Sequence, residues 1–212
     1  MRTRDRILET ALRLFNRHGY GAVTTAMLAG ECGIAEGNLW YHFKTRHALL
    51  EALSERFAAM LEARLAMPAS GDAIEDYVRL LAVAMHEFRA FRFFFRDQPA
   101  YGEHSELVRA RAPQWLERSF DQIEARLVAL ADAGLLDWPR ERLRDLAINA
   151  TIILRYGLEH YRELGVPTEA GSGTVRRTLE RHLTLFEHRL VPAAAARLRA
   201  ALDHIEIAAL AA

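Results

Sequence analysis

The chain has 212 residues, of which 51% are hydrophobic and 26% charged, a composition typical of a folded protein with one large or two small domains. Its 28 basic and 28 acidic side chains cancel, so the net charge alone indicates no partner, and the single cysteine excludes an internal disulfide and a thiolate metal cluster. No stretch approaches about 18 consecutive apolar residues, and the N-terminus lacks the apolar core of a signal peptide. We therefore expect a cytoplasmic protein that does not span a membrane.

Long helix-forming runs dominate the sequence, and its six prolines and twelve glycines gather in the breaks between them. This pattern predicts an all-α fold. The first helix is expected over residues 3–18, where apolar side chains recur at helical spacing and Gly19 follows as a helix-terminating glycine. Residues 1–50 hold seven basic and four acidic side chains, whereas the rest of the chain holds 21 basic and 24 acidic ones. A positive N-terminal end suits a protein that presents this end to phosphates.

Residues 24–46 have the pattern of a helix-turn-helix motif. They predict a short helix over residues 25–32, a turn at Gly33 and a second short helix over residues 36–41. A third helix is expected to start near Thr45. In such a motif the first helix crosses the DNA backbone, and the N-terminal end of the second enters the major groove, whose width suits one α-helix.

The segment GIAEGNLWYHFKT, residues 33–45, closely resembles the recognition segment of the TetR family of bacterial transcriptional regulators. The matching features are a turn glycine, a buried aliphatic residue, a glycine at the groove, an aromatic pair, a His-Phe pair and a basic residue: Gly33, Ile34, Gly37, Trp40, Tyr41, His42, Phe43 and Lys44. The resemblance covers roughly residues 3–57. It implies a helix-turn-helix DNA-binding domain at residues 1–47 and a helical ligand-binding and dimerisation domain at residues 48–212.

The resemblance also implies which residues face the DNA. These are Thr25, Glu36, Gly37, Asn38, Trp40, Tyr41, His42 and Lys44. Gly37 lets the backbone approach the bases, and Asn38 is placed either to pair with adenine N6 and N7 or to contact a phosphate. Ala35 stands where the family usually has a capping Ser, so we expect Glu36 to supply part of the lost helix-dipole complementarity. Trp40 stands where the family usually has Tyr, so its indole N–H can donate to a phosphate but cannot accept a hydrogen bond.

Beyond the motif, the third helix is predicted to continue from residue 45 to about residue 67, so that one rigid helix links the DNA-binding end to the body. Residues 68–72 then break the chain. An apolar helix or pair of helices is expected over residues 73–97, ending in the sequence FRFFFRD. Its four phenylalanines cannot all face one core at helical spacing, so some are expected to face a second surface, a cavity or a partner helix: Phe91, Phe93, Phe94 and Phe95.

After a second break at residues 98–102, the pattern predicts helices over residues 103–112, 113–133, 139–164 and 174–191, and a final helix that Pro192 opens. The helix over residues 139–164 is apolar on more than one face, as expected for an element between its own domain and a partner. The resemblance implies that it and the helix over residues 174–191 pair with their copies in a four-helix dimer interface. One helix-turn-helix reads only a few base pairs, so we expect a two-fold homodimer on a palindromic operator in double-stranded DNA.

The resemblance implies a ligand-responsive repressor whose mostly apolar small-molecule effector tilts the linking helix and releases the operator. Aromatic side chains on the expected helices are candidate lining residues: Phe94, Tyr101, Trp115 and Tyr156. An aromatic residue at helical spacing is equally a candidate for the core. An effector with an acid group would have four side chains available: Arg92, Arg96, His86 and Arg155. The alternative is a helix-turn-helix regulator whose C-terminal domain binds a protein instead of a small molecule.

Enzyme motifs are absent from the sequence. It contains no G-x-S-x-G, P-loop or dinucleotide fingerprint, so we expect neither catalysis nor a cofactor. Nine histidines include no H-x-x-x-H spacing, so no metal site is predicted. The carboxylates are scattered among arginines at helix-surface spacing, which favours solvated ion pairs over an acid/base pair.

Overall fold

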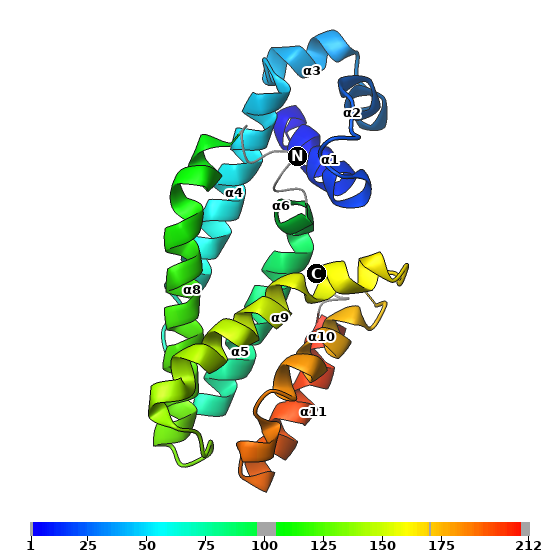
Figure 1. Cartoon of the computed structure of the whole chain (residues 1–212). Helices are drawn as coiled ribbons and strands as arrows, with labels where there is room; N and C mark the ends of the chain where they lie inside the picture. Colours follow the sequence, from blue (N-terminus) through cyan, green and yellow to red (C-terminus); the bar gives the residue numbers. More distant parts are fainter. Residues whose placement is uncertain (1, 97–104, 170, 209–212) are drawn as a thin grey trace. The chain divides into compact units, whose positions relative to one another are not determined.

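The computed structural model describes residues 2–96, 105–169 and 171–208, and the regular structure in these ranges is helical (Figure 1). The helices are α1 (Thr3–His18), α2 (Thr25–Cys32), α3 (Glu36–His42), α4 (Arg46–Leu65), α5 (Ala73–Ala90), α6 (Arg92–Arg96), α8 (Glu106–Asp132), α9 (Leu143–Glu163), α10 (Thr174–Leu183) and α11 (Pro192–Ala208), with short 3-10 turns η1 (Arg140–Arg142) and η2 (Glu187–Arg189). The predicted all-α fold is confirmed. Within the described ranges, no helix has the length and apolar character needed to span a bilayer.

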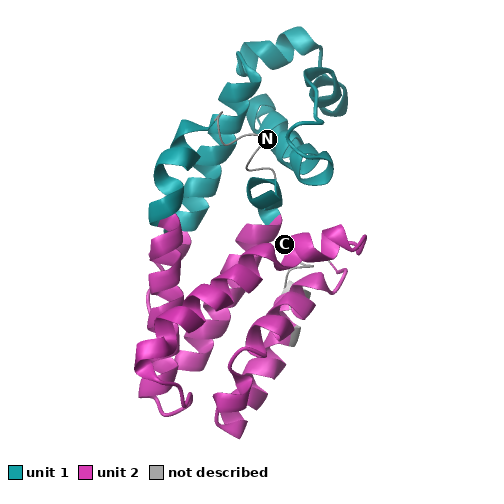
Figure 2. Cartoon of the chain, in the orientation of Figure 1, with its two compact units in different colours: residues 1–62, 90–114 teal, residues 63–89, 115–212 magenta. Residues whose placement is uncertain are grey.

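The chain forms two compact units (Figure 2). Unit 1 contains residues 1–62 and 90–114, and unit 2 contains residues 63–89 and 115–212. The domain boundary expected after residue 47 lies inside unit 1, and the boundary between the units falls within α4, after residue 62. The boundary between the two compact units thus differs from the domain boundary that the sequence pattern predicted.

The core of unit 1 is built on aromatic side chains. Phe15 of α1 has its ring centre 5.1 Å from that of Tyr20 and 5.3 Å from that of Phe93. Phe57 of α4 lies at the centre of a second group, and its ring stacks on that of Phe94 at 5.0 Å. Such contacts add to the free energy gained by burying the rings themselves.

Three of the four phenylalanines of the FRFFFRD segment are buried in this core, and Phe95 is only partly buried, so the expectation that some face a second surface, a cavity or a partner helix stays a prediction. Phe91, Phe93 and Phe94 are all buried, and the Phe95 ring lies 5.9 Å from that of Phe57. The physical reason is a turn at Phe91, between α5 and α6, which resets the helical period. Side chains that could not share one face of a continuous helix thereby reach the same core.

The end of α1 is fastened to the start of α6. The Asn16 side-chain amide donates to the Ala90 carbonyl at 2.8 Å, and its carbonyl oxygen accepts from the Phe93 N–H at 3.1 Å. Arg96 donates to the Phe15 carbonyl at 2.7 Å and to the Asn16 carbonyl at 3.1 Å. Because the last carbonyls of a helix lack partners within it, these arginine contacts both satisfy hydrogen bonds and complement the helix dipole. The residues after Ala90 consequently belong to unit 1.

The core of unit 2 contains paired polar groups among its apolar side chains. Tyr77 of α5 and His182 of α10 are fully buried, and the Tyr77 hydroxyl lies 2.6 Å from His182 Nε2. Burial lowers the pKa of His182 from 6.5 to about 4, so the ring is neutral at pH 7. Helices α9 and α10 also pack very closely, since a Cβ atom at Gly157 would lie 2.4 Å from Thr178 Cγ2.

A buried ion pair stabilises another part of unit 2. Arg64 Nε, in the last turn of α4, donates to the Glu87 carboxylate at 2.6 Å, and both side chains are almost fully buried. The remaining guanidinium nitrogens donate to Gln122 at 2.6 Å and Ser119 at 2.9 Å. Burial raises the pKa of Glu87, and the positive charge of Arg64 opposes that rise. The pair joins α4, α5 and α8 within unit 2.

Two predicted boundaries were wrong. The helices expected over residues 103–112 and 113–133 are one helix, α8, with Pro113 inside it. An interior proline removes one N–H from the helical ladder and crowds the carbonyl four residues earlier, so it opposes the helix, whereas the buried Val108 before it and Trp115 after it favour keeping the helix in place. The helix expected to reach residue 191 ends at Leu183, because the backbone at residues 189–191 pairs with residues 135–137 instead of continuing a helix.

Candidate DNA interface

The helix-turn-helix has the local geometry that its residue types favour. Thr24 caps α2, and its hydroxyl accepts a hydrogen bond from the Met27 N–H at 3.2 Å. Gly33 ends α2 in the left-handed conformation with φ of 64°, and the Ile34 N–H donates to the Ala29 carbonyl at 3.0 Å. A side chain at residue 33 would be strained in this conformation, so the glycine fixes the turn between α2 and α3.

The candidate recognition helix α3 has one buried anchor and an exposed face. Leu39 is 2% exposed and attaches the helix to the unit 1 core, whereas the Tyr41 side chain is 75% exposed. Glu36, Gly37 and Asn38 form an exposed first turn. This is the arrangement a recognition helix needs, because its N-terminal residues must reach base edges while its opposite face stays packed.

Each predicted DNA contact falls on this part of unit 1. Glu36, Gly37, Asn38, Tyr41 and Lys44 are exposed, and Thr25, Trp40 and His42 are partly exposed. As expected from Ala35, α3 has no side-chain cap at its N-terminus. The roles of the individual residues stay predictions.

Two contacts relate these side chains to each other. The Thr25 hydroxyl at the start of α2 donates to the Glu36 carboxylate at 3.4 Å, which joins the first turns of the two helices. Lys44 Nζ lies 5.8 Å from the centre of the Tyr41 ring, near a cation–π distance. Thr45 then caps α4 by accepting from the Ala48 N–H at 3.0 Å. Tyr41 and Lys44 thus lie together at the junction of α3 and α4.

Two arginine contacts in this region had no signal in the sequence pattern. The Arg4 guanidinium lies 4.9 Å over the ring of Phe43, directly after α3. The Arg46 guanidinium lies 4.0 Å over the ring of Tyr20, and its Nε and Nη2 atoms are buried and have no hydrogen-bond acceptor among the described residues. Arg46 therefore braces the start of α4 against the loop after α1. Both contacts join residues more than 20 positions apart, beyond the reach of helical periodicity.

The residues predicted to line an effector pocket that the structure describes fall in both units. Phe94 is buried in unit 1, stacked on Phe57. Trp115 is buried in unit 2, and Tyr156 of α9 is 46% exposed. Tyr101 lies outside the described residues. Their part in ligand binding stays a prediction, and the same holds for the side chains suggested for an acid group.

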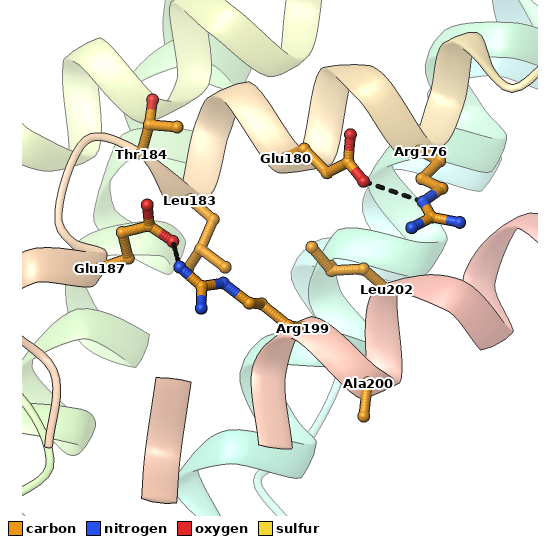
Figure 3. A pocket seen from close by; sticks show the side chains of 8 residues that line it. All are labelled: Arg176, Glu180, Leu183, Thr184, Glu187, Arg199, Ala200 and Leu202. Carbon is orange, nitrogen blue, oxygen red and sulfur yellow. Dashed lines mark hydrogen bonds and ion pairs between the residues drawn. The ribbon is translucent and has the colours of Figure 1, made fainter. Parts of the chain in front are cut away.

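Helix α11, to which the sequence pattern assigned no role, borders surface pockets of unit 2. The first encloses 360 Å³ between α10, η2 and α11 (Figure 3). Leu183 and Leu202 line it, and two ion pairs border it: Arg176 with Glu180 at 2.8 Å, and Arg199 with Glu187 at 2.6 Å. The second encloses 450 Å³ between α5 and α11, lined by Ile74, Glu75, Val78, Arg197, Ala200, Ala201 and His204. Both volumes lie in the range of small-molecule sites.

Helix α9 leaves an apolar stripe exposed. Ile152 is 49% exposed and Tyr156 is 46% exposed, one helical turn apart. Another side of α9 packs on α10, where Gly157 lies close to Thr178. Apolar residues on an outer helix face, rimmed by polar ones, are typical of a protein–protein interface.

Family comparisons cover nearly the whole chain. Residues 7–53 match the family described as bacterial regulatory proteins, tetR family, and residues 56–198 match the one described as bacterial transcriptional repressor. The tetracycline repressor protein class C of Escherichia coli is 32% identical over 131 residues, which are 62% of this chain and 54% of that repressor. The match thus spans about half of the relative's length.

Solved structures share the fold. A TetR-family transcriptional regulator from Marinobacter aquaeolei VT8 gives a TM-score of 0.81 at 24% identity and covers 97% of this chain and 99% of its own. A putative transcriptional regulator from Saccharomonospora viridis in complex with choline gives a TM-score of 0.64 at 23% identity and covers 89% of this chain and 97% of its own. At these identities the likeness shows the fold alone.

Proposed function

The chain belongs to the TetR family of bacterial transcriptional regulators, and on that premise we propose that it is a ligand-responsive repressor acting as a homodimer. The dimer binds a palindromic operator through α3 of each copy. A small, mostly apolar effector binds unit 2 and releases the operator.

The exposed first turn of α3 is the observation that carries this proposal. Glu36, Gly37 and Asn38 face solvent while Leu39 holds the helix to the core. Gly37 has no atom within 4 Å of the place a Cβ would take, so the backbone there is open to a base edge. We expect Asn38 either to pair with adenine, a bidentate contact worth about 1–3 kcal/mol of discrimination, or to contact a phosphate.

The homodimer is supported by the exposed apolar stripe of α9. One α3 reads a few base pairs, and two copies reach successive major grooves only when held about 34–36 Å apart. Ile152 and Tyr156 give α9 a surface that an identical helix from a second copy can cover.

The effector part of the proposal has two supports. Unit 2 has pockets of 360 and 450 Å³, large enough for a small molecule. The regulator from Saccharomonospora viridis, which shares the fold, is in complex with choline. Linkage then requires the effector to bind the free protein some 5- to 150-fold more tightly than the operator-bound protein, for a typical coupling of about 1–3 kcal/mol.

Selection from a random duplex library tests the DNA part directly. We expect enrichment of one palindrome whose half-sites are centred about 10 base pairs, or a multiple of this, apart. The Asn38→Ala variant should lose preference at one base position in each half-site while its affinity for the other positions is retained. An equal loss at every position would assign Asn38 to a phosphate, and the absence of any enriched sequence would overturn the repressor proposal.

Calorimetry tests the effector part once a ligand is in hand. Its affinity is measured for the free protein and for the protein saturated with operator. Equal affinities would contradict release by the effector, because a ligand that binds two states equally shifts nothing. A protein partner for the C-terminal region would then be the better explanation.

A further inference from the structure

The first turn of α1 carries a positive cluster that the family motif does not include. Arg2, Arg4 and Arg6 are all exposed, and Asp5 is the only acid among them. Within the described ranges none of the three arginines makes an ion pair. We name these three side chains the α1 arginine cluster.

Two other charged side chains of α1 form ion pairs. Arg13 forms an ion pair with Glu31 at 2.7 Å, and Glu9 forms one with Arg56 of α4. The α1 arginine cluster therefore differs from Arg13 and Glu9 of the same helix. Among the described residues, no acidic side chain forms an ion pair with any of its three arginines.

Local stability does not explain the cluster. Arg2 and Arg6 lie one helical turn apart, where like charges repel, and the Arg6 N–H donates to the Arg2 carbonyl at 3.1 Å. Positive side chains at the N-terminal end of a helix also oppose the helix dipole. Three arginines at this position therefore lower the stability of α1 in the free protein. An anion beside them would remove both penalties.

Arg4 connects the cluster to the candidate DNA interface. Its guanidinium lies 4.9 Å over Phe43, the residue that ends α3 and directly precedes Lys44. Phe43 itself is buried, so this contact holds the arginine at the edge of the recognition helix. Lys44 follows Phe43 in the chain, and its Nζ atom lies 5.8 Å from the centre of the exposed Tyr41 ring.

We propose that the α1 arginine cluster binds the DNA phosphate backbone beside the major groove that α3 enters, extending the interface beyond α2, α3 and Lys44. The inference rests on the proposed DNA-binding function. The contact is electrostatic and independent of base sequence, so it adds equally to operator and non-specific binding. Arg4 is the central residue, because Phe43 fixes its position.

Salt titration measures this contact without knowledge of the operator. The full-length protein is titrated onto a fluorescently labelled random-sequence duplex at salt concentrations from about 50 to 200 mM. One phosphate contact contributes about 0.9 to the slope of log K against log salt, so Arg4→Gln should lower the slope by about that amount per bound copy. Arg6→Gln should lower it as well, although it leaves the Arg4–Phe43 contact intact.

Two further variants separate charge position from packing. Arg17→Gln makes the same charge change at the exposed far end of α1 and should leave the slope at the wild-type value. Arg4→Lys keeps the charge but loses the planar guanidinium, and it should keep the wild-type slope. Thermal unfolding of each variant verifies that it is folded.

The outcomes distinguish the two proposals. Equal slopes for Arg4→Gln and Arg17→Gln would overturn the α1 contact while the wild-type protein still binds DNA. A loss in Arg4→Lys as large as in Arg4→Gln would also overturn it, since packing on Phe43 would then be the cause. A wild-type protein with no salt-dependent DNA binding would instead overturn the proposed function itself.

Discussion

Unit 1 and unit 2 differ in where they keep their charges. Among the described residues, the buried side chains of unit 1 include no Arg, Lys, His, Asp or Glu, and its core is built on Phe15, Phe57 and their aromatic neighbours. The buried residues of unit 2 include Arg64, Asp76, Glu87, Glu159 and His182. Unit 1 exposes most of the charged side chains at the candidate DNA interface, whereas unit 2 pairs several of its charges inside.

This difference predicts which substitutions each unit tolerates. An aromatic core gives unit 1 a fixed platform, so its exposed side chains can change what DNA they bind at little cost in stability. A buried polar pair is energetically costly when only one partner is lost, because the other is left desolvated and unpaired. Single substitutions in unit 2 should therefore change the free energy of unfolding, and surface substitutions in unit 1 should change DNA binding.

The largest effect is expected from Glu87→Ala. The substitution leaves Arg64 buried with its charge uncompensated, which typically costs about 3–5 kcal/mol. Chemical denaturation at one fixed protein concentration measures the loss. The matched change Glu9→Ala removes the carboxylate of the exposed Arg56–Glu9 pair in unit 1 and should cost little.

A double variant sharpens this test. Replacing both Arg64 and Glu87 by apolar residues of similar size, Arg64→Met with Glu87→Leu, should recover most of the stability, because no unpaired charge remains. If Glu87→Ala were no more harmful than Glu9→Ala, the contrast between the two units would not hold.

The next effect concerns pH and His182. Its pKa falls from 6.5 to about 4 in the folded protein because it is fully buried. Below pH 6.5 the unfolded chain takes up a proton that the folded chain does not, so the free energy of unfolding falls as the pH falls. At about 1.4 kcal/mol per pKa unit, the loss approaches about 3 kcal/mol near pH 4.

Comparison with His182→Gln isolates this contribution from other titrating groups. Glu87 acts in the opposite direction: its raised pKa lets the folded protein take up a proton first. The wild-type stability should therefore fall more steeply between pH 6.5 and 4 than that of His182→Gln. Parallel curves would show that His182 is not held neutral by the fold.

A smaller effect is expected where α9 packs on α10. Gly157→Ala would place a Cβ 2.4 Å from Thr178 Cγ2, and overpacking of this kind costs about 1–3 kcal/mol. Thr178→Ala should restore stability to Gly157→Ala by removing the clashing atoms. In unit 1, Gly30→Ala in α2 has open space and should stabilise by up to about 1 kcal/mol. Equal effects of the two glycine substitutions would contradict the close approach of α9 and α10.

The sequence predicted the DNA-binding end more closely than the rest because the signals there are local. Thr24 caps a helix three residues away, and Gly33 ends it in a conformation that glycine adopts freely. The bounds of α1 and α2 came out as predicted for this reason. The family motif then identified the exposed first turn of α3.

The features that the sequence did not predict depend on contacts between residues far apart in the chain. Arg64 meets Glu87 across 23 positions, and Asp137 bonds Arg189, which stops the helix expected to reach residue 191. Helical periodicity contains no information about such pairs. It also cannot separate a pocket aromatic from a core aromatic, and Phe94, chosen as a candidate lining residue, is stacked on Phe57 in a core.

The smallest expected effect on stability, and a selective one on binding, belongs to Lys44→Ala. Lys44 is exposed beside Tyr41 and makes no ion pair within the described ranges, so its removal should leave the free energy of unfolding nearly unchanged. If it contacts a phosphate, affinity should fall alike on operator and random DNA, and the salt slope should fall by about 0.9 per bound copy. The change at the distant exposed Arg17, Arg17→Ala, should alter neither quantity. An unchanged slope in Lys44→Ala would remove Lys44 from the interface, whereas a large loss of stability would mean that Lys44, like Arg46 and Arg96 of the same unit, helps to hold the fold.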